Sequence, residues 1–228
     1  MRGEQASDRS VRLQLDLTLY LVTDPDLGGD RGLIDVVAAA VQGGVTLVQL
    51  RDKRAGGRAL LEQARALKAV LDPAGVPLLI NDRVDIALAA GAAGCHLGQT
   101  DLPAHAARAL LGPDAILGVS MDAVDQASAV DPEDVDYVAY GPFAATATKA
   151  DAGPPIGAVG LAAVHRRTAL PLVAIGGVHA GNLAAAIEAG ADGIAVVSAI
   201  MAADDPQAAS RQLRGLIDAA RERREVRA

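Results

Sequence analysis

Residues 78–97 read LLINDRVDIALAAGAAGCHL, and this stretch contains the unit that decides the predicted fold. The apolar run Leu78–Ile80 predicts a strand buried on both faces, and the alanine-rich segment Arg83–Ala90 predicts a helix. Gly91 follows that helix, where glycine adopts the left-handed conformation of a helix end without strain. The apolar run Gly94–Leu97 predicts a second strand, so the whole stretch is a strand–helix–strand unit.

The same alternation recurs along the chain of 228 residues. Eight apolar runs are predicted strands: Leu17–Val22, Thr46–Leu50, Leu78–Ile80, Gly94–Leu97, Ile116–Val119, Tyr137–Tyr140, Leu172–Ile175 and Gly193–Val197. The predicted helices between them include Ile34–Gln42, Arg58–Leu71, Arg83–Ala90, Ala104–Leu111 and Gly181–Ala189, and a last helix runs from Gln207 to about Arg224. Eight strand–helix units of roughly 26 residues each predict a compact (β/α)8 barrel, a fold of the α/β class.

We therefore predict one domain, a (β/α)8 TIM barrel over residues 17–228, preceded by a tail over residues 1–16. An open, doubly wound sheet is the alternative. The first predicted strand is not followed by the G-x-G-x-x-G pattern of dinucleotide-binding sheets, which weakens that alternative. The charged segment Arg221–Glu225 is expected to be a solvated end of the last helix.

The composition argues against a nucleic-acid partner. The net charge is −7 at pH 7, and the aromatic side chains are Tyr20, Tyr137, Tyr140 and Phe143. Cations that neutralise phosphates and rings that stack on bases are therefore both scarce. Cys95 is the single cysteine, which excludes an intrachain disulfide and a cysteine-rich metal site. We expect Cys95 to fill the core of a protein that works in a reducing compartment.

The sequence predicts no association with a membrane. No apolar run reaches the roughly 20 residues that cross a bilayer. The segment Met1–Asp16 is polar and lacks the apolar core of a signal peptide. We therefore expect a soluble, cytoplasmic protein, and the sequence leaves its oligomeric state open.

Polar residues and glycines follow most of the predicted strands, and the carboxyl ends of barrel strands carry the active site. Gln49, Arg51 and Lys53 alternate at the end of the second strand, and we expect them to point together into the barrel mouth. Two cations and an amide at that place suit a diphosphate. The alternative is a solvated loop with a surface ion pair.

Asp82 and Asp101 end neighbouring predicted strands and indicate a metal site. Mg²⁺ takes one or two carboxylates together with phosphate oxygens and water, so the two side chains suit a clamp on a diphosphate. The alternative is helix N-capping, because both residues precede helical stretches. His96 is expected to be a packed, hydrogen-bonded residue rather than a catalytic base.

Two further regions predict a second anion site. Thr146, Thr148 and Lys149 lie in a long loop after the sixth strand, where hydroxyls and an ammonium suit a phosphate. Gly176-Gly177 and Val197-Ser198 end the last two strands, where backbone N–H groups often bind phosphate. A loop without function and ordinary tight turns are the alternatives.

The distribution of charge narrows the substrate class. The whole chain is acidic, yet the predicted mouth gathers Arg51, Lys53 and Lys149. A cationic cleft on an acidic protein favours small anionic substrates over a polyanion. The residues thus predict two anion sites, one for a diphosphate with Mg²⁺ and one for a monophosphate.

Taken in order and at barrel spacing, these motifs resemble the thiamine phosphate synthase family over nearly the whole chain. The matching motifs are Leu19-Tyr20-Leu21-Val22-Thr23-Asp24, Gln49-x-Arg51-x-Lys53, Asn81-Asp82, His96-Leu97-Gly98-Gln99-x-Asp101, Thr146-x-Thr148-Lys149, Ala174-Ile175-Gly176-Gly177 and Val197-Ser198-Ala199-Ile200. The chain departs from the family at Phe143-Ala144-Ala145, where an aliphatic and then an aromatic residue are usual. This departure concerns the packing of the loop rather than the Thr-x-Thr-Lys motif.

The resemblance implies a transferase of thiamine biosynthesis that joins hydroxymethylpyrimidine diphosphate to thiazole phosphate and releases pyrophosphate. It implies that the pyrimidine diphosphate would be contacted by Gln49, Arg51, Lys53, Asn81, Ser120 and Lys149. It implies that Mg²⁺ would be held by Asp82 and Asp101. It implies that the thiazole phosphate would be held by Thr146, Thr148, Gly177, Val197 and Ser198.

The resemblance also implies a dissociative reaction, in which pyrophosphate leaves and the thiazole nitrogen captures a pyrimidine carbocation. The predicted catalytic residues are Arg51, Lys53, Lys149 and Ser120. The three cations among them would stabilise the charge that develops on the leaving group.

Three other functions stay open at this point. A thiazole tautomerase would share the barrel and the monophosphate site but would not need the diphosphate clamp. A non-catalytic barrel would bind a phosphorylated ligand without turnover. A sugar-phosphate epimerase or isomerase would need paired acid and base residues, which the sequence does not show.

Overall fold

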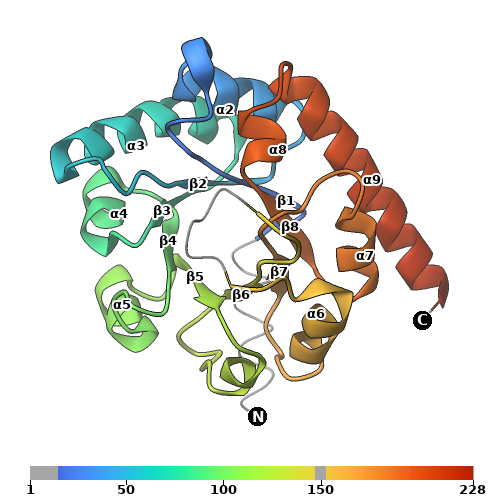
Figure 1. The fold of residues 1–228 in the computed structure, drawn as a ribbon. Helices are drawn as coiled ribbons and strands as arrows, with labels where there is room; N and C mark the ends of the chain where they lie inside the picture. Colours follow the sequence, from blue (N-terminus) through green and yellow to red (C-terminus); the bar gives the residue numbers. More distant parts are fainter. Residues whose placement is uncertain (1–14, 147–152, 228) are drawn as a thin grey trace.

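The computed structural model describes residues 15–146 and 153–227, and its parallel strands close into a barrel (Figure 1). The strands are β1 (Leu19–Val22), β2 (Leu47–Leu50), β3 (Leu78–Asn81), β4 (Gly94–Leu97), β5 (Ile116–Met121), β6 (Tyr137–Tyr140), β7 (Leu172–Ala174) and β8 (Gly193–Val196). They follow one another around the barrel in chain order. Each predicted strand is present, with bounds that differ by at most a few residues.

Pairing between the first and last strands closes the sheet. Strand β1 pairs with β2 in a register that places Tyr20 opposite Leu47. The same strand pairs with β8, which places Leu19 opposite Ile194. The predicted (β/α)8 barrel is therefore confirmed, and the open doubly wound sheet is wrong because β1 and β8 are neighbours.

Helices surround the barrel and cover its outer face (Figure 1). They are α2 (Leu33–Gln42), α3 (Gly57–Leu71), α4 (Val84–Ala90), α5 (Ala104–Leu111), α6 (Gly157–His165), α7 (Leu183–Glu188), α8 (Ser198–Met201) and α9 (Pro206–Arg227), with 3-10 helices at Gly29–Arg31, Asp72–Ala74 and Val124–Ser128. The connection from β5 to β6 holds the last of these 3-10 helices. The short helix α8 was not predicted, because its four residues are too few to show a helical period.

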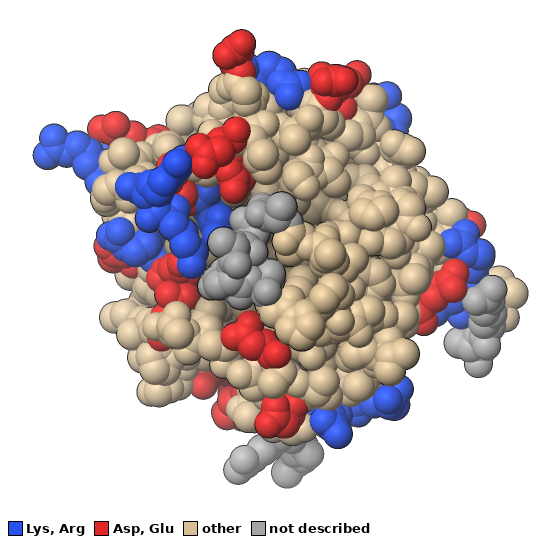
Figure 2. Space-filling view, in the orientation of Figure 1, with Lys and Arg blue, Asp and Glu red and all other residues tan. Residues whose placement is uncertain are grey.

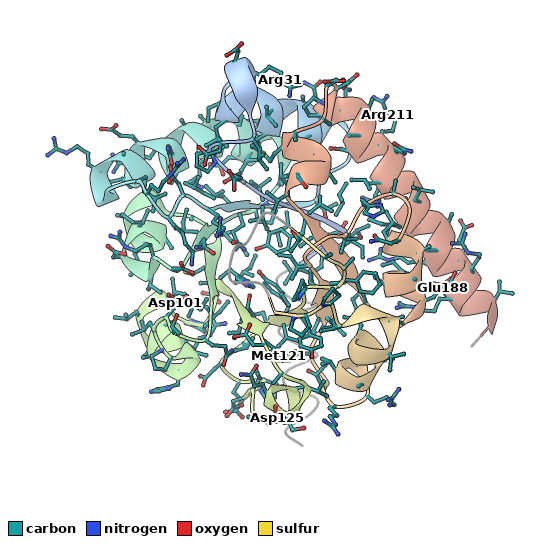
Figure 3. All side chains as sticks on the ribbon, viewed as in Figure 1. Arg31, Asp101, Met121, Asp125, Glu188 and Arg211 are labelled. Atoms are coloured by element: carbon teal, nitrogen blue, oxygen red, sulfur yellow. The ribbon has the colours of Figure 1, made fainter. Side chains whose placement is uncertain are left out.

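Alternation along the strands divides the core into two layers. Leu19 and Leu21 face outward and pack among helix residues such as Val36. Tyr20 faces inward and packs with Tyr137 from the opposite wall, with ring centroids 6.0 Å apart. Side chains fill the barrel (Figure 3), so its interior is packed rather than open. Continuous apolar strands are explained by this burial on both faces.

A buried ion pair joins elements at the base of the barrel. Arg108 on α5 lies 2.6 Å from the carboxylate of Asp136, the residue before β6. The same guanidinium donates to the backbone oxygens of Asp134, Gly112 and Ala115. The Asp136 carboxylate also accepts the N–H of Leu117. Because both charges are paired and hydrogen-bonded, their burial is compensated.

The last helix is less solvated than the sequence suggested. Arg221 donates to the hydroxyl of Thr18 and to the backbone oxygen of Asp192. Arg224 donates to the backbone oxygen of Ala191 at 3.0 Å. The prediction of a solvated charged end is therefore wrong for these two arginines, which bind a hydroxyl before β1 and carbonyls before β8.

Other features of the predicted organisation are tested only in part. Within residues 15–146 and 153–227, no helix is long and apolar enough to cross a membrane. The predicted tail over residues 1–16 lies almost wholly outside the described residues, so the division at residue 16 stays a prediction.

Candidate functional site

Charged side chains gather on one side of the barrel. Figure 2 shows them beside α3 and α4, whereas the side towards α6 and α8 is largely uncharged. Ion pairs on the charged side join Arg51 to Asp24, Lys53 to Asp82, Arg54 to Asp26 and Arg83 to Asp85. These residues follow the carboxyl ends of β1, β2 and β3, where barrel enzymes carry their active sites.

The segment after β2 presents one amide inward and two cations beyond the strand. Gln49 is buried inside the barrel. The strand ends at Leu50, so the expected alternation of three inward side chains holds only for Gln49. Arg51 lies 4.0 Å from Asp24, and Lys53 Nζ lies 3.4 Å from the carboxylate of Asp82. The two cations thus lie over neighbouring strand ends rather than together above β2.

The Asp82 carboxylate lies close enough to that of Asp101 for the two to interact. Burial raises the pKa of Asp82, the hydrogen bond and negative charge of Asp101 raise it further, and Lys53 opposes the shift. Asp82 has a φ of 62°, a strained value for a residue with a side chain. Asp101, on the β4–α5 side of the molecule (Figure 3), accepts the N–H of Gly98 at 2.7 Å.

The N-capping alternative is wrong for both aspartates. The N-cap of α4 is Arg83 and that of α5 is Pro103, and neither helix start has a side-chain capping hydrogen bond. Asp82, a carboxylate whose pKa is raised by burial and by a neighbouring carboxylate, forms with that neighbour a donor set that a divalent cation relieves. Among residues 15–146 and 153–227, no group of three His, Cys, Asp or Glu is placed to hold a metal. Mg²⁺ usually keeps several coordination positions for water and phosphate oxygens. The pair therefore fits Mg²⁺ better than a metal whose ligands all come from the protein.

Inward-facing polar residues line the upper layer of the barrel interior. Asn81 ends β3 one position beyond the outward-facing Ile80, and it lies opposite His96 of β4 in the register. The hydroxyl of Ser120, near the end of β5, forms a hydrogen bond of 2.8 Å with His96 Nε2. Alternation along each strand therefore turns Gln49, Asn81 and Ser120 into the barrel. Gln49 lies opposite Leu79 in the register, so Asn81 lies nearer the mouth than Gln49.

A chain of hydrogen bonds crosses the barrel and was not predicted. The amide of Gln49 donates to the hydroxyl of Tyr20, which lies 2.9 Å from the hydroxyl of Tyr137. The Tyr137 hydroxyl lies 2.7 Å from His96 Nδ1, and the other ring nitrogen contacts Ser120. Burial lowers the pKa of His96 to about 4 and raises the pKa of both tyrosines. His96 is thus the buried, hydrogen-bonded histidine that the sequence led us to expect.

The opposite side of the mouth is built from backbone. Gly176 and Gly177 follow β7 with φ values of 86° and 66°. A Cβ on Gly177 would lie 2.5 Å from the backbone oxygen of Ala144, so this position excludes a side chain. Ser198 is the first residue of α8 and follows Val197, its N-cap. The N–H groups of a first helical turn point away from the helix and favour an anion.

The predicted loop residues are described only in part. Thr146 is half-buried and is the last described residue before the gap. Thr148 and Lys149 lie outside the described residues, so their predicted roles are not tested. Phe143, which departs from the family pattern, is buried and packs in the layer between strands and helices.

Comparison with known proteins identifies the family of the chain. The family described as thiamine monophosphate synthase matches residues 19–200. A thiamine-phosphate synthase of Xanthobacter autotrophicus is 59% identical over 206 residues, which cover 90% of this chain and 98% of that protein. A thiamine-phosphate synthase of Azorhizobium caulinodans is 56% identical over 206 residues, which cover 90% of this chain and 97% of that protein.

A solved structure shows the same relationship in three dimensions. The thiamine phosphate pyrophosphorylase of Pyrococcus furiosus superposes with a TM-score of 0.83 at 33% sequence identity. The superposition covers 91% of this chain and 98% of that protein. Sequence and structure agree along almost the whole chain, and the chain belongs to the thiamine monophosphate synthase family.

Proposed function

We propose that the protein is a thiamine phosphate synthase that joins hydroxymethylpyrimidine diphosphate to thiazole phosphate. In this reaction the bond between the pyrimidine methylene and the diphosphate oxygen breaks, and the electron pair leaves with pyrophosphate. A bond then forms between the same methylene and the thiazole nitrogen, which supplies its own electron pair. Family membership supports the reaction class, and the contact between Asp82 and Asp101 beside Lys53 is the observation that carries the diphosphate assignment.

Asp82 and Asp101 are the residues that would hold Mg²⁺ together with the diphosphate. When bound, the ion would neutralise negative charge on the leaving group. Lys53 lies 3.4 Å from Asp82 and therefore stands where it can reach a diphosphate held at the carboxylates. Arg51, 4.0 Å from Asp24, is another cation of this side and also follows β2. We propose that both stabilise the pyrophosphate as its charge develops.

The inner layer of the barrel suits a pyrimidine ring that carries positive charge. The residues Gln49, Asn81 and Ser120 offer neutral polar groups at the ends of β2, β3 and β5. Since the pKa of His96 is lowered to about 4, its imidazole is neutral at pH 7 and does not repel a cation. This supports the proposal that the reaction passes through a pyrimidine carbocation.

The thiazole phosphate is proposed to bind at the backbone side of the mouth. Gly177 permits a close approach to the chain after β7, and Ser198 begins α8 after β8. Loops after the last two strands are the usual phosphate site of a barrel. Thr146 lies in the loop after β6, and we keep Thr148 and Lys149 as proposed members of the site. The nucleophile would thus be held by groups distinct from those that hold the leaving group.

A product assay tests the proposal. The purified protein is mixed with Mg²⁺, hydroxymethylpyrimidine diphosphate and thiazole phosphate, and thiamine phosphate is measured as fluorescent thiochrome. Mg²⁺-dependent product is the expected result, with chelated-metal and single-substrate reactions as controls. Absence of product, with thiazole phosphate still bound, would favour the tautomerase or the non-catalytic barrel. We propose a cytoplasmic location for the reaction, in keeping with Cys95 being a buried free thiol.

A further inference from the structure

Two residues of the proposed pyrimidine site are the ends of one buried hydrogen-bond chain. Gln49 lies at one end and Ser120 at the other, on strands β2 and β5. Between them lie Tyr20, Tyr137 and His96, from β1, β6 and β4. Each contact joins residues that are far apart in the sequence, so the chain bridges the barrel interior rather than following one strand.

The direction of each hydrogen bond follows from the first one. The Gln49 amide donates to Tyr20, so the Tyr20 hydroxyl gives its own proton to Tyr137. Tyr137 then gives its proton to Nδ1 of His96, which leaves the ring proton on Nε2. Nε2–H donates to Ser120, so the Ser120 hydroxyl proton is left to point towards a ligand.

One competing arrangement exists, in which every hydrogen bond runs in the opposite direction. In it, each of the five side chains again has a hydrogen-bond partner. If the Gln49 amide turned over, its oxygen would accept from Tyr20 and every later bond would reverse. Ser120 would then donate to His96 and offer a ligand only its acceptor oxygen. A doubly protonated His96 fits neither direction beside a donating Gln49, because two donors would meet at Tyr20. The buried ring is accordingly neutral, and burial lowers its pKa to about 4.

We propose that Tyr20, Tyr137 and His96 are positioning residues that couple Gln49 to Ser120 by fixing one shared hydrogen-bond direction. In that direction Gln49 offers the site its amide oxygen and one N–H, and Ser120 offers a donor. An amine beside a ring nitrogen, as in a 4-aminopyrimidine, matches the oxygen and N–H of Gln49. A 4-oxopyrimidine presents the reverse pattern of donor and acceptor. Its binding would require every hydrogen bond between Gln49 and Ser120 to reverse. The identity of the ligand in this inference rests on the proposed function, whereas the direction of the hydrogen bonds does not.

Nitrogen NMR of the ligand-free protein tests the direction without any assay of activity. The chain has four histidines, and His105, His165 and His179 are exposed. Replacing these three with Gln leaves His96 as the single histidine, whose two ring nitrogens are then read directly. The expected spectrum has a protonated Nε2 and an unprotonated Nδ1. A proton on Nδ1 would overturn the inference, whatever the enzyme does.

Binding to two analogues tests the coupling. The probes are hydroxymethylpyrimidine diphosphate and its 4-oxo analogue, measured by calorimetry with Mg²⁺ and without thiazole phosphate. Tyr137→Phe removes the central hydroxyl, so Gln49 and Ser120 can turn independently. We expect the preference for the 4-amino ligand to fall by about tenfold, the effect of one hydrogen bond left without its partner.

Tyr140→Phe is the matched control, because Tyr140 is a buried tyrosine of the same strand that packs in the outer layer. The preference of this variant for the 4-amino over the 4-oxo ligand should stay within about twofold of that of the parent protein. Such a change in free energy is smaller than the loss of one hydrogen bond. An unchanged preference in a folded Tyr137→Phe protein would overturn the coupling. A protein that makes no thiamine phosphate yet shows the expected NMR spectrum would contradict the proposed function and keep the inferred direction.

Discussion

The two sides of the barrel mouth are built from different chemical groups. The side after β2, β3 and β4 uses charged side chains: Lys53 pairs with Asp82, which contacts Asp101. The side after β7 and β8 uses the chain itself, with Gly177 held against Ala144 and α8 starting at Ser198. Figure 2 shows the same contrast around the mouth: charged side chains gather beside α3 and α4, whereas the surface towards α6 and α8 is largely uncharged.

Under the proposed function, this difference would allow one small mouth to hold two anions for different purposes. A leaving diphosphate gains charge during the reaction, so cationic side chains and a metal site placed around it would stabilise that charge. A phosphate that only anchors its molecule needs fixed donors, which backbone N–H groups provide without added charge. We therefore expect changes on the charged side to affect turnover and changes on the backbone side to affect binding.

The largest effect is expected from removing both carboxylates. Asp82→Asn combined with Asp101→Asn should lower Mg²⁺-dependent turnover by about a thousandfold or more, comparable to losing a major charge contact in a transition state. Binding of thiazole phosphate, measured by calorimetry, should be nearly unchanged. Asp85→Asn, an exposed carboxylate paired with Arg83, is the matched control. Full activity of the double variant would sink the metal assignment.

The next effect is expected at the backbone side. Gly177→Ala would place a Cβ 2.5 Å from the Ala144 oxygen at a φ of 66°, so the loop must shift. We expect a loss of stability of about 1–3 kcal/mol and weaker binding of thiazole phosphate. Gly215→Ala, where the added Cβ meets open space on α9, should stabilise slightly and is the control. Unchanged phosphate affinity in Gly177→Ala would move this site elsewhere.

A smaller effect separates backbone from side chain at Ser198. Ser198→Pro removes one N–H at a helix position that tolerates proline, whereas Ser198→Ala keeps the N–H and removes the hydroxyl. We expect the proline variant to bind thiazole phosphate about tenfold more weakly, as for the loss of one charge-assisted hydrogen bond. The alanine variant should bind nearly as well as the parent. Equal loss in both variants would assign the contact to the hydroxyl instead.

The smallest effect concerns stability rather than binding. The raised pKa of Asp82 means that its charged form is disfavoured in the folded state, so the carboxylate destabilises the fold at neutral pH. Asp82→Asn should therefore raise the midpoint of thermal unfolding by roughly 2–4 °C at pH 7, the shift for about 1 kcal/mol in a chain of this size. Asn also tolerates the left-handed backbone there.

The sign of the pH dependence sharpens this prediction. As the pH falls through the raised pKa of Asp82, this carboxylate becomes protonated in the parent protein. The loss of stability that its charge causes then disappears. The difference between parent and variant should shrink on acidification, as followed by calorimetry between pH 7 and pH 4. A variant that is less stable than the parent at pH 7 would show that the ion pair with Lys53 outweighs the repulsion.

Much of the fold could be predicted because it depends on local patterns. Buried parallel strands need apolar residues on both faces, and each of the eight runs forms a strand. The positions of Gln49, Asn81 and Ser120 also follow from alternation near strand ends. Helix α8 could not be read in this way, because four residues are too few to show a helical period. The roles of Arg221 and Arg224 could not be read either, because contacts with carbonyls far away in the sequence decide them.

The interior network could not be predicted for a related reason. Tyr20 and Tyr137 are 117 positions apart, and their hydroxyls meet only because the barrel brings opposite walls together. The sequence showed that each lies in an apolar strand, which is typical of core residues. The contact between Asp82 and Asp101 was anticipated from neighbouring strands, but the capping alternative was excluded only by the helix starts at Val84 and Ala104.

The pairing of β1 with β8 has a consequence for how the chain is made. About 170 residues separate these strands, and a ribosome adds roughly 5–20 residues per second, so β1 waits about 10–30 s for its neighbour. During that time the backbone groups of β1 on that edge lack the strand that will cover them. That edge of β1 therefore stays open to wrong strand pairing and to chaperones until β8 has been synthesised.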